Sequence, residues 1–255
     1  MLLLLSPSKR LDYDTPVKSS VKTTPEFIDQ SARLARELKK LTPKQISALM
    51  GINDELALLN HERFQDWQSP MPDADTRQAA LAFKGDVYFG LEAETLTAKQ
   101  LEYAQDHLRI LSGLYGILRP LDGILPYRLE MGTKLKNKAG KDLYQFWGSS
   151  IAESINRQLD QIGSRIVLNC ASNEYFKAID KKTLDAEVVS PVFKDMTKGS
   201  YRIVTVYAKK ARGTMAAWVI RKKAKTLKKL KQFDGDGYRY DEESSTDTKP
   251  VFLRG

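Results

Sequence analysis

The stretch from His107 to Gly132 constrains the fold more than any other part of this chain. It holds four glycines, two prolines and three arginines among leucines, isoleucines and tyrosines. The spacing of its first leucines predicts a helix that begins at Thr97 and runs to Leu114. The two prolines then exclude a continuing helix. A long, apolar loop is uncommon in a globular domain unless it has a function, and its buried backbone needs hydrogen-bond partners.

The charged side chains of this loop allow two interpretations. In the first, Arg119 and Arg128 pair with Asp122 and Glu130 and hold a buried loop in place. In the second, the arginines line a cleft that receives phosphates, because a planar guanidinium can donate two parallel hydrogen bonds to a phosphate. The spacing of these residues does not separate the two.

Composition suggests an anionic partner. The chain has 255 residues, a net charge of +9 and an isoelectric point near 9.4, which suits nucleic acid, a nucleotide or acidic lipid. The opening MLLLL is too short for a signal peptide and no apolar run could span a bilayer, so we expect a cytoplasmic protein without a membrane role. The single cysteine, Cys170, lies in an apolar strand and is predicted to be an inert buried thiol.

The hydrophobic pattern predicts a single mixed α/β (α+β) domain over residues 1–255. A central mixed sheet with surrounding helices is the expected architecture. Strands are expected at 1–5, 165–170, 187–193 and 201–208, with an edge strand at 251–253. Helices are expected at 26–41, 42–50, 54–64, 76–82, 97–114 and 143–159, and a polar loop at 12–24.

Residues 42–66 form a helical excursion from this domain. Its turn resembles the hairpin of helix-hairpin-helix DNA-binding motifs, in which amides at the start of the second helix face a phosphate. Asn53 replaces the usual second glycine, and two acids follow it. A plain pair of packed helices is the alternative. The candidate phosphate contacts in this segment are Lys44, Gly51, Ile52 and Asn53.

Residues 209–231 are the most basic part of the chain. They contain ten lysines and arginines and no acid, while one helical face stays apolar. A basic amphipathic helix lies on DNA, on an acidic membrane or simply in solvent, and this charge density favours an anionic partner. The acidic segment 234–247 is expected to neutralise it in part.

Metal and cofactor chemistry find little support in the sequence. The two histidines are far apart, and there is no Glu-x-x-His pair, Walker loop or dinucleotide fingerprint. Ser6 to Lys9 matches the Ser-x-x-Lys pattern of penicillin-recognising enzymes, but both companion motifs are missing. We therefore expect no bound metal and no cofactor.

Several ordered blocks resemble the YaaA family of bacterial peroxide-stress proteins. The signature-like region is SGLYGILRPLDGILPYRLEMGTKL. Further matching blocks are LLSPSKRLDY (4–13), LAFKGDVYFGL (81–91), KDLYQFWG (141–148), LNCASNEYFKAI (168–179), VFKD (192–195) and YAKKARGTMAAWVI (207–220). The resemblance implies a DNA-binding protein of the hydrogen peroxide response, linked to repair and to lower free iron, with a positive cleft and a helix-hairpin-helix. The sequence offers no iron-storage site, so any effect on iron is expected to be indirect.

These observations lead to one hypothesis and one alternative. The chain is predicted to bind DNA, as duplex or repair intermediates, by holding backbone phosphates without sequence preference. Outside the hairpin, the candidate phosphate ligands are Lys9, Lys84, Arg119, Arg128, Lys177, Lys194, Lys209, Lys210 and Arg212. The alternative is an enzyme acting on a nucleotide or another phosphate-bearing small molecule in the same cleft, with Glu130, Glu174 or Lys194 as acid, base or nucleophile. A nucleotide-sized pocket would favour the enzyme, and a groove as wide as a duplex would favour DNA binding.

Overall fold

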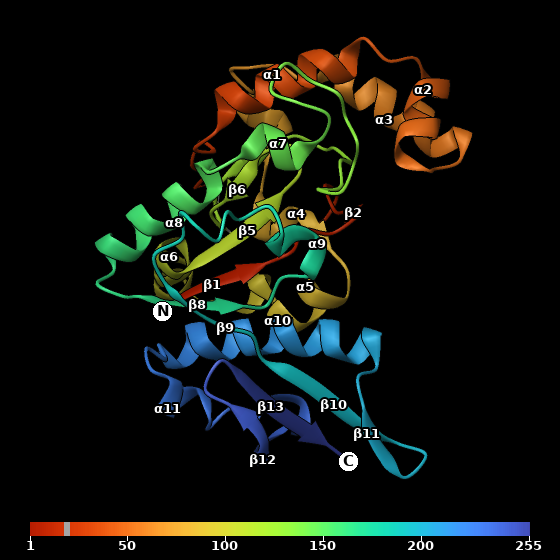
Figure 1. The fold of residues 1–255 in the computed structure, drawn as a ribbon. Coiled ribbons are helices and arrows are strands. Elements are labelled where there is room, and N and C mark those ends of the chain that lie inside the picture. Colours follow the sequence, from red (N-terminus) through yellow and green to blue (C-terminus); the bar gives the residue numbers. More distant parts are fainter. Residues whose placement is uncertain (18–20) are drawn as a thin grey trace.

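Strand β1 lies at the centre of the largest sheet in the computed structural model, which describes residues 1–17 and 21–255 (Figure 1). Part of the predicted loop 12–24 therefore lies outside the described residues. The strand order is β6-β5-β1-β8-β9, with β6 antiparallel to β5 and the other pairs parallel. The strands are β1 Leu2–Leu5, β5 Leu108–Ser112, β6 Gly116–Leu118, β8 Ile166–Asn169 and β9 Glu187–Val189. Every residue of β1 is buried, as expected for an apolar strand inside a parallel sheet.

The predicted helix 97–114 is wrong in its second half. Helix α6 covers Ala98–His107, and at Leu108 the chain becomes β5, which pairs with β1. All five residues of β5 are buried. Apolar residues therefore occupy both faces of the strand, and their spacing cannot distinguish a buried strand from a buried helix.

Short helices and strand pairs surround this sheet. The helices are α1 Ile28–Lys39, α2 Pro43–Met50, α3 Asp54–Asp66, α4 Ala79–Ala82, α5 Asp86–Leu91, α7 Leu143–Trp147, α8 Ser150–Gln161 and α9 Asn173–Phe176, with 3-10 turns at Asp73–Asp75 and Ala93–Thr95. The small pairs join β2 Arg10–Leu11 to β4 Phe83–Lys84 and β3 Arg77–Gln78 to β7 Gly123–Ile124. The predicted helix 143–159 is split at Gly148, whose φ of 49° and ψ of −123° are not helical. Only the last four residues of the predicted helix 76–82 are helical, because β3 occupies its start.

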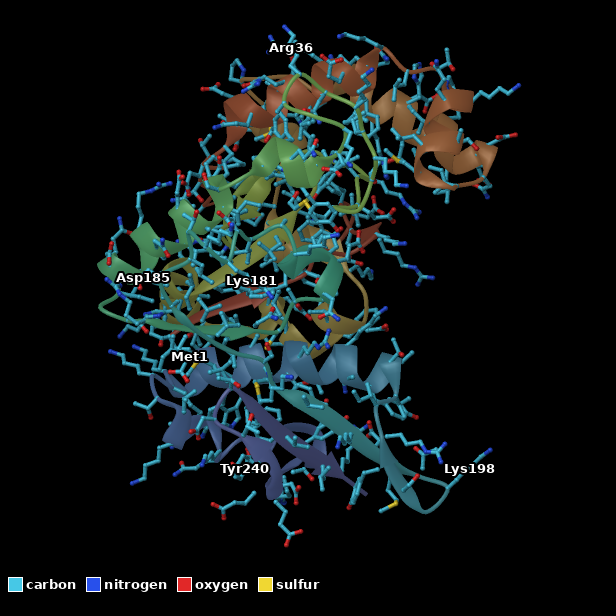
Figure 2. The ribbon with its side chains drawn as sticks, viewed as in Figure 1. Met1, Arg36, Lys181, Asp185, Lys198 and Tyr240 are labelled. Atoms are coloured by element: carbon cyan, nitrogen blue, oxygen red, sulfur yellow. The ribbon has the colours of Figure 1, made fainter. Side chains whose placement is uncertain are left out.

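A second sheet of four strands has the order β11-β10-β13-β12. Its strands are β10 Val192–Thr197, β11 Ser200–Arg202, β12 Arg239–Thr246 and β13 Lys249–Arg254. The predicted edge strand 251–253 is therefore an inner strand, parallel to β10 and antiparallel to β12. Lys198 and Gly199 both have positive φ and form the tight turn between β10 and β11 (Figure 2). The mixed α/β class is confirmed, and this sheet adds a layer that the sequence did not indicate.

Helix α10 lies between the two sheets (Figure 1) and covers Thr205–Lys222. The predicted strand 201–208 is correct for Tyr201 and Arg202, which belong to β11, and wrong beyond them, since helix α10 begins at Thr205. The predicted basic helix 209–231 is correct as far as Lys222, where α10 ends. Lys223 adopts a left-handed conformation, and the short helix α11, Leu227–Leu230, follows it. A 3-10 turn at Gly235–Gly237 then leads into β12. Eight residues of α10 are buried, as expected for a helix packed on two sides. Within the described residues, no helix combines the length and apolarity needed to cross a bilayer.

Candidate functional site

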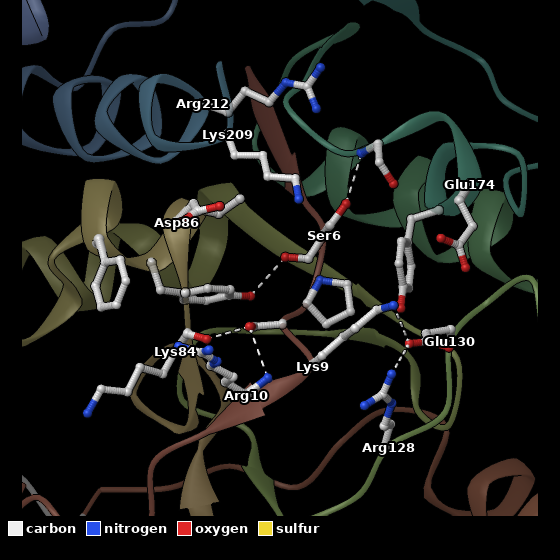
Figure 3. Close-up of a pocket in the computed structure, with 18 of the residues that line it drawn as sticks. Ser6, Lys9, Arg10, Lys84, Asp86, Arg128, Glu130, Glu174, Lys209 and Arg212 are labelled. Atoms are coloured by element: carbon white, nitrogen blue, oxygen red, sulfur yellow. Dashed lines mark hydrogen bonds and ion pairs between the residues drawn. The ribbon is translucent and has the colours of Figure 1, made fainter. Parts of the chain in front are cut away.

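A cavity of about 590 Å³ opens at the carboxyl ends of β1 and β8 (Figure 3). In this sheet, the next strand of the chain after β1 is β5, which lies on one side of β1. The next strand after β8 is β9, which lies on the opposite side of the sheet. Ligands of open α/β sheets bind at such a change of direction. The two strand ends are joined directly, because the Ser172 amide donates to Ser6 Oγ at 2.8 Å.

Cations outnumber acids around this cavity. We call it the cationic cavity and define it by its charged lining. Its cations are Lys9, Arg10, Lys84, Arg128, Lys209 and Arg212. Its carboxylates are Asp86, Glu130 and Glu174. The set comes from five separate segments of the chain, so only folding brings it together.

The segment after β1 supplies Lys9 and, at the start of β2, Arg10. Ser8 Oγ donates to the carbonyl of Lys84 and accepts from the Arg10 amide at 3.2 Å. Gly85 permits this approach, because a Cβ there would lie 2.8 Å from Ser8 Oγ. The pairing of β2 with β4 then sets Arg10 opposite Lys84. Two exposed cations are thus fixed side by side at one rim of the cavity.

Glu130 is held between two cations. Its Oε1 lies 2.8 Å from Lys9 Nζ and 3.1 Å from Arg128 Nη2. Arg128 is mostly buried, and its Nε has no hydrogen-bond acceptor among the described residues. Arg128 therefore fits both interpretations of its loop, since it pairs with Glu130 and still has a donor without a partner.

Helix α10 brings Lys209 and Arg212 to the opposite wall (Figure 3). Two glycines set their position. A Cβ on Gly90 of α5 would lie 2.6 Å from the Thr214 amide, and one on Gly213 would lie 2.8 Å from the Leu91 amide. Because both positions lack side chains, α5 and α10 come into backbone contact.

Glu174 forms a third side of the cavity. Its Oε1 accepts from the Gly132 amide at 2.9 Å, which links α9 to the end of the long loop. The Tyr144 hydroxyl donates to the Glu174 carbonyl at 3.1 Å. The carboxylate is thereby oriented by the backbone of the loop and has no cationic partner among the described residues.

Arg119 does not line the cationic cavity. Its guanidinium lies 2.9 Å from the carboxylate of Asp122 and donates to the carbonyl of Thr24 at 2.8 Å. Asp122 is 1% exposed, and burial raises its pKa against the opposing effect of Arg119. For Arg119, the structural ion pair is the interpretation that the geometry favours.

Three further candidates also lie outside the cavity lining. Lys177 stacks over the Tyr144 ring at 4.8 Å, and Lys210 pairs with Asp236 at 3.3 Å. Lys194 belongs to β10 in the second sheet, opposite Leu253. Lys194 is therefore separate from Glu130 and Glu174, with which the enzyme hypothesis grouped it.

The α2–α3 hairpin has the predicted turn but an acidic face. Gly51 adopts φ 61° and ψ 45°, and Asn53 Oδ1 accepts from the Leu56 amide at 3.0 Å. Asp54 and Glu55 occupy the first turn of α3, where a phosphate would approach. Lys44 is exposed on α2, and Ile52 is partly buried. None of these residues lines the cationic cavity, and their contact with phosphate stays a prediction.

Two charged residues of the lining were not among the candidates that the sequence suggested. Arg10 follows Lys9 in the block 4–13, and Asp86 follows Gly85 in the block 81–91. The sequence indicated their importance by placing both residues in blocks that match the family. Neither side chain has an ion-pair partner in the part of the chain that the structure describes.

Comparison with known proteins assigns the family. The model for "Peroxide stress protein YaaA" matches residues 1–244. The chain belongs to the YaaA family of peroxide stress proteins. It is 52% identical to a UPF0246 protein of Shewanella denitrificans, over all of this chain and 98% of the relative. It is 50% identical to one of Saccharophagus degradans, over all of this chain and 99% of that protein. The predicted family is confirmed.

Cys170 of this YaaA-family chain borders the cationic cavity but is only 1% exposed. Burial raises the pKa of its thiol to about 12, although the charge of Arg212 opposes this shift. A thiol rather than a thiolate is therefore present at neutral pH, and the thiolate is the reactive form. Among the described residues, no group of three histidines, cysteines or carboxylates has the arrangement of a metal site.

Proposed function

We propose that this protein binds DNA without sequence preference, by holding backbone phosphates at the cationic cavity, as its part in the response to peroxide. The observation that carries the proposal is that Arg10, Lys209 and Arg212 meet at one cavity without an ion-pair partner among the described residues. Phosphate contacts position a protein on DNA but carry no sequence information.

The pairing of the other cations supports this choice. Lys9 and Arg128 share Glu130, and Lys84 pairs with Asp12 at 3.0 Å. The remaining cations repel one another across the cavity, and an incoming phosphate would relieve that repulsion. The unpartnered Nε of Arg128 adds a donor, since buried polar groups are ordinarily hydrogen-bonded.

The test measures the affinity for a fluorescent duplex as a function of salt. We expect a triple variant, Arg10→Ala, Lys209→Ala and Arg212→Ala, to bind more weakly and to reduce the salt slope by about one for each phosphate that the variant no longer binds. The matched control removes three exposed lysines outside the cavity lining: Lys181→Ala, Lys228→Ala and Lys249→Ala. Equal reductions of affinity in the two triple variants, or binding that does not depend on salt, would refute the proposal.

The size of the cavity supports a second candidate, a protein that acts on a nucleotide or another phosphate-bearing small molecule. Pockets for small ligands commonly measure about 300–1,000 Å³, and the cationic cavity falls within this range. A duplex would have to lie across its mouth. Glu174 and Asp86 would be the groups that exchange protons, because Glu130 already holds two cations.

Competition separates the two candidates. A mononucleotide that displaces the duplex at micromolar concentration, and is converted to a product on incubation, would establish the second candidate. Displacement only by longer DNA would support the first. Glu174→Gln is expected to abolish turnover but to leave duplex affinity within about twofold, since the change removes no cation.

A further inference from the structure

A second, smaller cavity adjoins the cationic one. It measures about 300 Å³ and shares Lys84, Tyr88 and Phe89 with the cationic cavity. Its wall is mainly apolar and includes Leu81, Leu96 and Leu101. We call it the apolar cavity. The two chambers together offer an anion-binding part and an apolar part with a common wall.

Phe89 is the unusual residue of that wall. Its side chain is 52% exposed although it lies on a well-anchored helix, α5. The ring of Tyr88 packs against Phe83 at 5.4 Å, whereas Phe89 has no aromatic neighbour among the described residues. The backbone contact between Gly90 and α10 fixes α5 and therefore fixes the position of Phe89. An exposed aromatic ring on a rigid element provides a stacking surface.

One ion pair lies at the boundary between the two cavities. Lys84 lines both cavities, and its partner Asp12 lines only the apolar one. The side chain of Lys84 is half exposed, so it can turn from Asp12 toward an incoming anion. Asp12, whose side chain is 14% exposed, then keeps its hydrogen bonds from the amide and hydroxyl of Thr15. A ligand with an anionic end and an apolar, flat end can therefore occupy both chambers.

We propose that the apolar cavity receives the nucleobase of a nucleotide whose phosphate lies in the cationic cavity, with the base stacked on Phe89. The proposal rests on the phosphate binding proposed above and names the ligand class of that site. A nucleobase is flat and aromatic, stacks on phenylalanine, and is joined to its phosphate by a short sugar. The nucleotide is either free or an unpaired unit of a DNA strand, since both present the same chemistry.

The first experiment compares ribose 5-phosphate with adenosine monophosphate by calorimetry. Both carry the sugar phosphate, and only the second carries a base. We expect the nucleotide to bind roughly 10- to 100-fold more tightly, which is the effect of one stacked base. Phe89→Ala should remove most of this difference and leave the affinity for ribose 5-phosphate unchanged. Phe89→Trp should retain the difference, and Leu58→Ala, an equally exposed apolar residue of α3, is the control.

The second experiment tests the DNA source with a single-stranded oligonucleotide that carries 2-aminopurine. A fluorescence change that disappears in Phe89→Ala but persists in Leu58→Ala would show a base of the strand in the apolar cavity. If neither the free nucleotide nor the oligonucleotide responds to Phe89→Ala, the inference is wrong. Phosphate binding that still depends on Arg10, Lys209 and Arg212 would then leave the proposed function standing, so the two failures are distinguishable.

Discussion

Replacement of Gly213 by alanine tests how the site is assembled. Gly213 lies inside helix α10, where alanine is normally favoured over glycine by about 1 kcal/mol. The structure predicts instead that Gly213→Ala destabilises the protein. A Cβ at this position would meet the carbonyl of Val87 roughly 1 Å inside the 3.0 Å limit that real Cβ atoms keep, and it would also lie 2.8 Å from the Leu91 amide. Both atoms belong to the backbone of α5 and cannot rotate away.

The expected cost follows from the two opposing contributions. Overpacking costs about 1–3 kcal/mol or more, and the rigid backbone places Gly213→Ala at the upper end of that range. After the gain in helix propensity, we expect the free energy of unfolding to fall by about 2 kcal/mol. For a chain of this size, such a decrease lowers the melting temperature by roughly 4–8 °C. Because α10 must move away from α5, the duplex affinity that depends on Lys209 and Arg212 should fall as well.

The assay is urea unfolding followed by tryptophan fluorescence, together with the duplex titration. Gly90→Ala should have a similar effect, since its Cβ would enter the same contact from α5. The double variant should be destabilised by less than the sum, because the first substitution already separates the helices. Lys222→Ala, at the exposed end of α10, is the control. A Gly213→Ala protein as stable as the wild type, with unchanged duplex affinity, would refute this account of how the helices fix the site.

Three further predictions concern residues away from the cavity mouth. Arg119→Ala should lower the free energy of unfolding by roughly 2 kcal/mol, because it leaves the buried carboxylate of Asp122 unpaired, and should barely change duplex affinity; a large decrease in affinity would contradict its structural role. Cys170 should resist thiol reagents near pH 8 until urea unfolds the protein, and rapid labelling of native protein would contradict its raised pKa. Burial lowers the pKa of His107 below its usual 6.5, so the neutral ring stabilises the fold above about pH 6.5, and this contribution is lost as the pH falls through the lower, folded-state pKa. In His107→Gln, the free energy of unfolding should depend less on pH in this range. An unchanged pH dependence would contradict the assignment of this effect to His107.

The sequence predicted best where one physical effect dominates. β1 is uniformly apolar, and the helix expected at 42–50 is α2, which is capped by Thr42 and begins at Pro43. It predicted poorly where tertiary pairing decides. The run after His107 is apolar on both faces, so only its pairing with β1 makes it a strand. The helix predicted at 209–231 was expected to be more basic than α10 is, because the charges from Lys223 onward were assigned to it although α10 ends at Lys222.

The composition of the candidate site was only partly accessible from the sequence. Seven of the predicted residues line the cationic cavity, and all of them lie in the family-like blocks: Lys9, Lys84, Arg128, Glu130, Glu174, Lys209 and Arg212. Arg119, Lys177, Lys194 and Lys210 occur in similar blocks yet lie elsewhere, because a block fixes a segment and not the direction of each side chain. Phe89 also lies in a family-like block, 81–91, but its exposure could be recognised only after folding.

The place of β13 in the second sheet has a consequence for how the chain is made. β13 lies between β10 and β12, so the sheet lacks an inner strand until residues 249–254 have left the ribosome. Until then Phe193, Phe233 and Tyr240 lack the ring of Phe252, against which each of them packs. A chain whose synthesis stops shortly before β13 would have an incomplete second sheet with exposed hydrophobic side chains. Such a chain is a target for chaperones and proteases.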